Sequence, residues 1–357
     1  MNKLSNFIQS AQFRVANLEA PIVLDIEKAI PAPMSGGHWL YSTRETLEFI
    51  KYMGFNAISH ANNHATDWGT DCLKDSLTLL RNMGILVAGA GNNLEEATRG
   101  SIMKYKDKSY GLVAMTTTFP KTAMSSNPTG KVLGRPGVSY IRHSFVVTLP
   151  EDEWVELRNI AMRSRLFIDI NDQAFNFLGY RIQLGKTHST TFVANKKDIE
   201  RVVSSVNQLI KKCKNVVVSV HCHESEDLNR FLPPSFLKNL ARTFIEDGAV
   251  GVVCHGAHNI RGIEIYNGYP IFYGLGNFAF DVKGEYPEFF YQGLAVRWSI
   301  EGNNAKNIQV QAVHINDRGV PTIPNKQQSD EIFSKLLDLS IGIRKISWID
   351  SACIELN

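Results

Sequence analysis

The sequence contains little cysteine and no long apolar run. Its five cysteines (Cys72, Cys213, Cys222, Cys254 and Cys353) are irregularly spaced and include no Cys-x-x-Cys pair. This pattern argues against both a disulfide framework and a cysteine-based zinc module. No segment approaches the ~18 consecutive apolar residues of a membrane helix, and the N-terminus lacks the apolar core of a signal peptide. As written, the chain is expected to be cytoplasmic, with no membrane segment.

The sequence also lacks a strong charge of either sign. The formal net charge is +3, and no basic arm or cluster of basic and aromatic residues is present, so nucleic acid is not an expected partner. With 357 residues, 44% of them hydrophobic, the chain can bury a large core. Its size suggests either one large domain with insertions or two domains, and no internal repeat is found.

Short apolar runs alternate with amphipathic segments, which is typical of an α/β protein. Strands are expected at 13–16, 55–59, 110–116, 216–220 and 249–253. Helices are expected to follow the capping box Ser42-Thr43-Arg44-Glu45 and to cover 151–164, 235–247 and a stretch beginning at Asp198. Residues 119–191 differ from this pattern: a long loop rich in Ser, Thr, Pro and Gly is followed by helical and β-like segments, which indicates a cap-like insertion.

Polar side chains follow four of the predicted strands. The strand ends read Asn17-Leu18-Glu19, Asn62-Asn63-His64, His221-Cys222-His223-Glu224 and His255-Gly256-Ala257-His258. Because side chains alternate along an extended chain, the two histidines of His-x-His can point into one site. Strand ends of a layered α/β protein lie along one edge, where ligands bind. Carboxylate, amide and imidazole groups together suit one or two Mn, Fe or Zn ions, and two such ions would lie ~3.5–4 Å apart.

Other polar residues are given structural interpretations. His60 and Asn277 are expected to satisfy backbone groups. Glu224 belongs either to a solvated loop or to the site, where it would accept a proton or orient a neighbouring histidine. His38, His143, His188 and His314 belong to no cluster and are left out of the site.

Several of these segments resemble a known family. The stretches Asn17–Pro21, Ala61–His64, His255–His258 and Pro270–Phe278 are similar to signature sequences of the CapA family of bacterial capsule (poly-γ-glutamate) synthesis proteins. The resemblance covers nearly the whole chain, so a single domain over 1–357 with an insertion at 119–191 is expected. The family is related to calcineurin-like metallophosphoesterases, which implies a four-layer α/β/β/α sandwich with a divalent metal site.

The resemblance also assigns roles to individual residues. It makes Glu19, Asn63, His221 and His258 the expected metal ligands. It places His64 as a substrate contact or acid, and His223 and His255 as further ligands or proton carriers. One departure stands out, because family members begin with a strand that ends in Gly-Asp and this sequence has none. The sandwich is therefore expected to lack its first strand, and either the start is truncated or the site is a weaker, mononuclear one.

Three functions are compatible with these features. The first is a metal-dependent hydrolase of phosphoesters or related bonds, in which His64 or His223 carries a proton, Arg135 or Arg261 neutralises an anionic substrate and Glu224 lines the substrate site. The second is a metal-dependent enzyme that modifies peptides by acid/base chemistry, such as an epimerase. The third is a non-catalytic protein of capsule assembly that binds polyglutamate. The corresponding partner is a small molecule, a peptide or polyglutamate.

Overall fold

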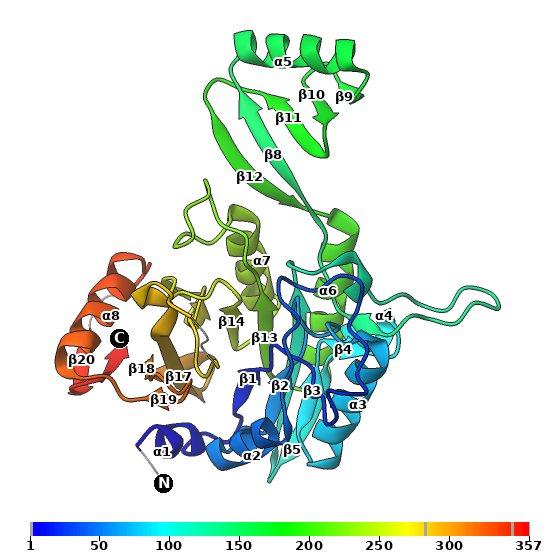
Figure 1. The fold of residues 1–357 in the computed structure, drawn as a ribbon. Helices are drawn as coiled ribbons and strands as arrows, with labels where there is room; N and C mark the ends of the chain where they lie inside the picture. The colour runs from blue at the N-terminus through cyan, green and yellow to red at the C-terminus, as the bar shows by residue number, and fades with distance from the viewer. Residues whose placement is uncertain (1–2, 282–283, 344–345, 357) are drawn as a thin grey trace.

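The computed structural model describes residues 3–281, 284–343 and 346–356, and shows a mixed α/β protein. Its first sheet contains three parallel strands in the order β1 (Val15–Asn17), β2 (Ala57–Ser59) and β3 (Leu86–Ala88). Helices α2 (Arg44–Met53) and α3 (Gly69–Asn82) cover one face of this sheet (Figure 1). The helices bury Leu47, Ile50, Leu73, Leu77 and Leu80 in a core that also contains Ile58 and Val87.

Helix α2 begins one residue later than its sequence predicts. Thr43, not Ser42, is the N-cap, and Thr46 completes the capping box. The backbone of Ser42 is engaged instead in a short parallel bridge, because its N–H donates to Pro21 O and its carbonyl accepts from Val23 N. Glu45 accepts a hydrogen bond from the Thr43 hydroxyl.

A six-stranded sheet forms the centre of the molecule. Its order is β15 (Ile263–Tyr266), β16 (Tyr269–Phe272), β14 (Gly251–His255), β13 (Asn215–His221), β6 (Lys108–Thr116) and β5 (Ser101–Tyr105). The four inner strands are parallel, and the two outer strands pair antiparallel with their neighbours. Helices α6 (Lys196–Ile210) and α7 (Ser235–Glu246) pack Val206, Leu240 and Phe244 against valines of β13.

The two sheets pack against each other through small side chains. Ala57 and Ala88 of the first sheet share a buried cluster with Leu112 and Ala114 of β6. Helices α2 and α3 thus pack on the first sheet, and α6 and α7 pack on the central sheet. Strands β1, β2, β13 and β14 carry the predicted site motifs at their carboxyl ends.

A C-terminal sheet flanks β14 and β16. It contains β17 (Gln292–Glu301), β18 (Asn304–Ile315), β21 (Cys353–Leu356) and β20 (Ile346–Asp350), and the short β19 (Pro321–Thr322) pairs with β18. Phe272 and Trp298 join it to the central sheet, and α8 (Lys326–Asp338) packs on it through Phe333 and Leu336. Helix α1 (Lys3–Gln9) packs beside Met53 and Val313.

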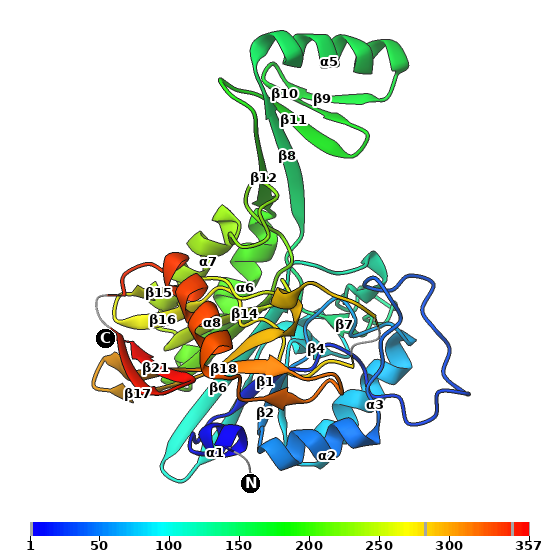
Figure 2. The same ribbon diagram turned by 60° about the vertical axis from the view of Figure 1, so that its left-hand side comes forward.

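A separate sheet projects away from the layered body (Figures 1 and 2). Its order is β12 (Ser189–Ala194), β8 (His143–Leu149), β11 (Tyr180–Leu184), β10 (Ala174–Phe177) and β9 (Phe167–Asn171). Helix α5 (Glu151–Ser164) covers its distal part, where Trp154 packs on Phe175. Strands β8 and β12 run side by side to the base of this projecting sheet, where His143 lies opposite Ala194. We refer to residues 143–194 as the projecting sheet.

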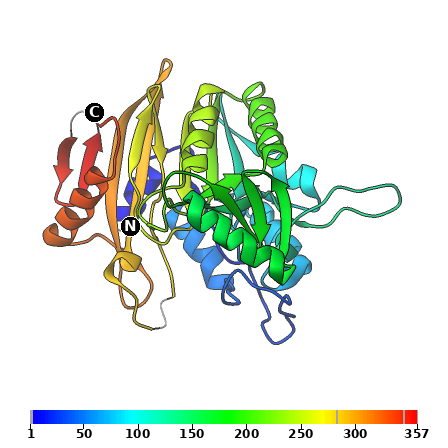
Figure 3. The same ribbon diagram turned by 90° about the horizontal axis from the view of Figure 1, so that it is seen from above.

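The remaining residues before the projecting sheet form small elements around the first two layers. These are β4 (Ala90–Gly91), α4 (Leu94–Thr98), the 3-10 turn η1 (Lys121–Ala123) and β7 (Gly137–Val138). Between η1 and β7 the chain folds into a hairpin with bridges at Ser126–Arg135 and Thr129–Val132, which extends to the right in Figure 1. The second 3-10 turn, η2 (Glu288–Tyr291), precedes β17. Seen from above, the C-terminal sheet lies on the opposite side of the molecule from this hairpin (Figure 3).

Candidate metal centre

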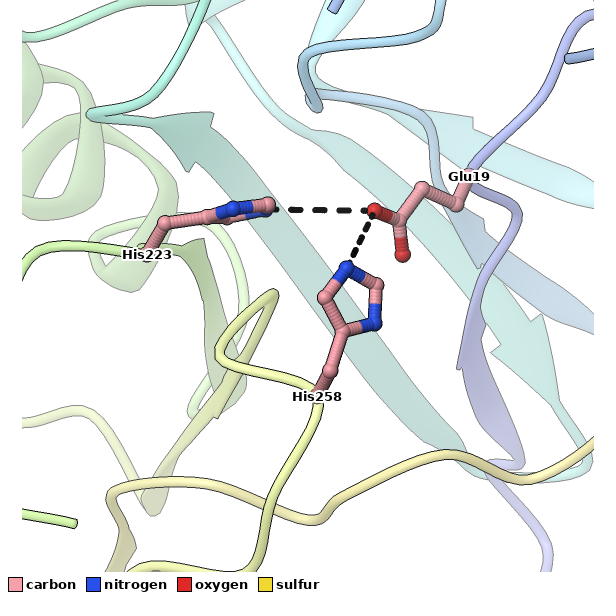
Figure 4. A group of neighbouring side chains, drawn as sticks. All are labelled: Glu19, His223 and His258. Atoms are coloured by element: carbon pink, nitrogen blue, oxygen red, sulfur yellow. Dashed lines mark ion pairs between the residues drawn. The ribbon is translucent and has the colours of Figure 1, made fainter. Parts of the chain in front are cut away.

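Three predicted site residues from different strand ends converge on one point. Glu19 follows β1, His223 follows β13 and His258 follows β14 (Figure 4). One ligand atom from each lies within 4.8 Å of the other two. Glu19 Oε1 is 3.9 Å from the Nε2 atoms of both His223 and His258. A carboxylate and two imidazoles, gathered in this way, form a suitable donor set for a transition-metal ion.

His221 lies directly behind this group. It is the last residue of β13, is fully buried, and its Nε2 lies 3.6 Å from Glu19 Oε1 and 2.9 Å from His223 Nε2. Its Nδ1 lies 2.9 Å from His255 Nδ1, and His255 Nε2 is 2.8 Å from the hydroxyl of Ser219. Four of the predicted histidines therefore form one cluster, with His223 and His258 on its accessible side.

Burial sets the protonation state of the cluster. Desolvation, followed by the neighbouring His258, lowers the pKa of His223 to about 4. Desolvation, followed by His223, lowers the pKa of His255 to about 3, and the pKa of His221 is also well below its ordinary value. Desolvation raises the pKa of Glu19, which the nearby His258 partly offsets. Neutral imidazoles keep a lone pair available for a metal ion.

Buried side-chain oxygens on two of the predicted ligands accept no hydrogen bond from the described residues. They are Glu19 Oε1 and Asn63 Oδ1. Asn63 donates its amide N–H to Gly36 O at 2.9 Å, which fixes Oδ1 as the free end. Buried acceptors are normally paired, so an unpaired one needs an explanation. Glu19, His223 and His258 fit a bound cation, which would satisfy the free Glu19 oxygen.

The backbone around the histidines accommodates their close approach. Gly256 has a φ of +103°, and a Cβ there would lie 2.8 Å from His223 Cδ2 and 2.9 Å from His221 Nε2. His258 has a left-handed φ of 55°. Its Nδ1 donates to Asn277 Oδ1 at 3.0 Å, and Asn277 donates in turn to Phe290 O at 2.8 Å. Asn277 therefore orients His258 and also binds backbone, the role its sequence position suggested.

The Asn62-Asn63-His64 segment, which follows β2, brings His64 near Glu19. His64 Nδ1 donates to the carboxylate of the fully buried Asp67 at 2.7 Å, and Asp67 also accepts the backbone N–H groups of Gly36 and Leu40. His64 lies close enough to Glu19 to favour its charged form. His60 has a structural partner, Leu18 O at 2.9 Å, and burial lowers the pKa of His60 to about 4.

Two of the three predicted substrate-site residues lie together, and the third lies apart from them. Glu224 and Arg261 are buried behind His223, where Arg261 Nη2 donates to Glu224 O at 2.9 Å. Although burial opposes ionisation, hydrogen bonds led by that from His143 lower the pKa of Glu224 to about 2. Arg135 lies exposed at the base of the hairpin, and its Nη2 donates to Thr122 O at 2.8 Å.

The sequence analysis gave no role to three residues that hold this site together. His143 binds Glu224 from 81 positions away, Ser219 binds His255, and Asp67 binds His64. Asp67 stands three residues after His64 in the same motif, a local signal that could have revealed the pair. No sequence pattern links His143 to Glu224, because the contact depends on where the projecting sheet joins the body.

Comparison with known proteins identifies the family. Residues 1–282 match the model of the bacterial capsule synthesis protein PGA_cap, and the chain belongs to this family. Its fold is α/β, and no helix in the described part of the chain has the length and apolar character of a membrane span.

Several relatives can be named. The uncharacterized proteins y4sH and y4uA of Sinorhizobium fredii are each 29% identical over 284 residues, which is 78% of this chain and 61% of theirs. The PGA biosynthesis protein CapA of Bacillus subtilis is 28% identical over 68% of this chain and 47% of its own. The capsule biosynthesis protein CapA of Bacillus anthracis is 21% identical over 99% of this chain and 71% of its own. The chain thus spans 61% of the length of the two Sinorhizobium relatives.

Proposed function

We propose that this protein is a metal-dependent hydrolase of phosphoesters or related bonds that serves capsule or poly-γ-glutamate synthesis. The observation that carries the proposal is the convergence of Glu19, His223 and His258 around a buried carboxylate oxygen that accepts no hydrogen bond from the described residues. Their ligand atoms come from three separate strand ends, so packing of the two sheets is what brings them together.

The layered fold supports the same proposal. Helices, sheet, sheet and helices follow one another, as the relation to metallophosphoesterases implies, and the site lies at the carboxyl ends of β1, β2, β13 and β14. The first strand described is β1, at the edge of its sheet. Glu19, His223 and His258 would hold one ion, and His221 and Asn63 are available as ligands to the same ion or a second one.

A divalent ion held at these residues would polarise a substrate oxygen and lower the pKa of a water molecule. The chain supplies the remaining functions. Asp67 holds His64 by Nδ1, so Nε2 is the atom left to exchange a proton with the substrate or the leaving group. Asn277 holds His258 by Nδ1 and leaves its Nε2 facing Glu19. The buried His221–His255–Ser219 chain fixes the orientation of the inner imidazoles.

The proposal is tested first by metal content. Protein purified without chelator is measured by mass spectrometry, as wild type and as the double variant His221→Ala and His258→Ala. About one or two transition ions per chain are expected in the wild type, and the double variant should lose them. The matched control is His188→Ala, because His188 is exposed on the projecting sheet and pairs with Glu153, outside the cluster. A wild type that stays metal-free after reconstitution with Mn or Zn contradicts the proposal.

Activity assays then identify the reaction. Metal-dependent release of phosphate from a generic phosphoester supports hydrolysis. Incorporation of solvent deuterium at a peptide α-carbon would instead identify the peptide-modifying reaction. If a metal-loaded protein does neither but binds polyglutamate, the non-catalytic role holds.

A further inference from the structure

The loop that carries His223 is held from inside the molecule by Arg261. This segment, residues 222–232, will be called the His223 loop. Arg261 is buried, and its guanidinium donates to Glu224 O at 2.9 Å, His223 O at 3.4 Å and Arg230 O at 2.9 Å. These bonds fix the backbone of the loop, but none of them reaches a side chain of the cluster.

The outer side of the same loop is held by the projecting sheet. His143, the first residue of β8, donates from Nε2 to Glu224 Oε1 at 2.9 Å. The His143 ring neighbours two aromatic rings: it lies edge-on to Phe192 with a centroid distance of 5.0 Å and near-parallel to Phe236 at 6.2 Å. These contacts set the ring plane, so Nε2 points at the carboxylate.

A threonine side chain connects Glu224 to the backbone of His223 by hydrogen bonds. The Thr118 hydroxyl donates to Glu224 Oε1 at 2.8 Å and accepts the backbone N–H of His223 at 2.9 Å. The other carboxylate oxygen, Oε2, accepts from the Thr117 hydroxyl and from the thiol of Cys222, which adjoins His223 in the chain. A continuous set of hydrogen bonds therefore runs from β8 to the backbone of a candidate metal ligand.

Strand β12 makes a second attachment to the loop. Asp227 Oδ1 accepts the backbone N–H of Thr190 at 3.3 Å, and Glu226 Oε1 accepts the Thr191 hydroxyl at 3.5 Å. Asp227 and Leu228 both have left-handed φ values, 47° and 58°. Consecutive left-handed residues without glycine persist only where surrounding contacts hold them. The projecting sheet supplies contacts of that kind.

We propose that His143 is a positioning residue of the metal centre, and that the projecting sheet uses it to fix His223 for metal binding. The proposal rests on the proposed metal function and adds to it, because the projecting sheet becomes part of the support of the site in addition to any role as a cap. Partners of ligating histidines that lie outside the coordination sphere commonly affect metal affinity in this way.

The test variant is His143→Phe in the full chain. Phenylalanine keeps the ring contacts with Phe192 and Phe236 and removes only the donor to Glu224. The dissociation constant for Zn²⁺ is measured by competition with a chelating dye, and the absorption spectrum of bound Co²⁺ reports ligand geometry. We expect Zn²⁺ binding about 10–100-fold weaker than in the wild type, with an altered Co²⁺ spectrum. The control is His188→Phe, the same change at an exposed histidine of the same sheet.

A second measurement does not depend on metal. Amide hydrogen exchange of the His223 loop is followed in the metal-free protein, and faster exchange is expected in His143→Phe but not in His188→Phe. If His143→Phe fails to fold, Thr118→Val removes the hydroxyl that links Glu224 to His223, and Thr78→Val, on the exposed side of α3, is its control.

The outcomes are distinguishable. Weaker Zn²⁺ binding and faster loop exchange in His143→Phe alone support the proposal. Unchanged Zn²⁺ affinity and unchanged exchange overturn it while leaving the proposed function intact. A wild type that binds no metal refutes the proposed function and with it the role in metal binding, and the exchange data then decide whether His143 positions the loop.

Discussion

Gly256 offers a direct test of how tightly the histidine cluster is built. Its backbone passes between His221 and His223, and a Cβ placed there would lie 2.9 Å from His221 Nε2 and 2.8 Å from His223 Cδ2. Gly256→Ala must therefore move at least one imidazole by several tenths of an ångström. In the buried His221, the atom nearest to the added methyl group is Nε2, the nitrogen that faces Glu19.

The change has two separable effects. At a φ of +103°, alanine is strained, which costs about 1–3 kcal/mol of stability. The displaced imidazole is a separate effect and should appear as lost metal affinity. Displacement of a ligating atom should weaken binding by at least the 10–100-fold that is typical of losing a supporting contact.

The matched control is Gly248→Ala. Gly248 follows α7 and has a similar φ of +110°, but the nearest contact of an added Cβ is 3.5 Å, to Ile210. Both variants are expected to melt at lower temperature than the wild type by a similar amount. Only Gly256→Ala should lose affinity for Zn²⁺ in dye competition. Equal Zn²⁺ affinity in the two variants would refute the view that metal binding depends on the positions of His221 and His223.

Three further predictions concern residues that support the site or the projecting sheet. Asp67→Asn leaves Nδ1 of His64 without its carboxylate, so kcat should fall while the Zn²⁺ dissociation constant stays within about twofold; a parallel loss of metal would contradict a role in proton transfer. Asn277→Leu removes the partner of His258 Nδ1 and should weaken Zn²⁺ binding by about 10–100-fold, with kcat at saturating metal less affected. Asp198 lies at the base of the projecting sheet; burial raises the pKa of its carboxyl, but hydrogen bonds from arginine outweigh this and hold that pKa below its ordinary value. Its stabilising contribution is present at neutral pH and is lost as the pH falls through the folded-state pKa. The melting temperature of Asp198→Asn should therefore differ from wild type at pH 7 and converge with it as the pH falls below the ordinary pKa of an aspartate.

The local parts of the fold could be predicted from sequence. Helix α5 spans Glu151–Ser164 as expected, and α7 ends one residue before its predicted end. Both helices could be predicted because apolar periodicity and flanking glycine or proline are local signals. The strand ends could be predicted for the same reason, and Glu19, His221, His223, His255 and His258 come together. Strands β20 and β21 were not among the expected strands. They form by pairing, β21 with the distant β18 and β20 with β21.

The features that the sequence did not predict depend on contacts between distant segments of the chain. The sequence indicated a cap-like insertion at 119–191, whereas the projecting sheet covers 143–194. The boundaries differ because part of the loop at 119–135 forms a hairpin of its own and the projecting sheet begins only at β8. Glu224 follows a histidine motif in an acidic stretch, and the sequence left open whether it belongs to a solvated loop or to the site. In the structure it is buried and bonded to His143 and to Thr117 and Thr118, which follow β6. No local pattern records partners so far along the chain.

The two ends of the projecting sheet bear on how such a module can be exchanged. Because His143 and Ala194 are register partners on adjacent antiparallel strands, the chain leaves the body and returns to it at one point. Everything beyond a few residue pairs of β8 and β12 could be replaced by a tight two-residue turn without moving either end. The distal part of the projecting sheet is therefore a module that can be deleted or replaced as a unit, while the residues at its base stay with the body.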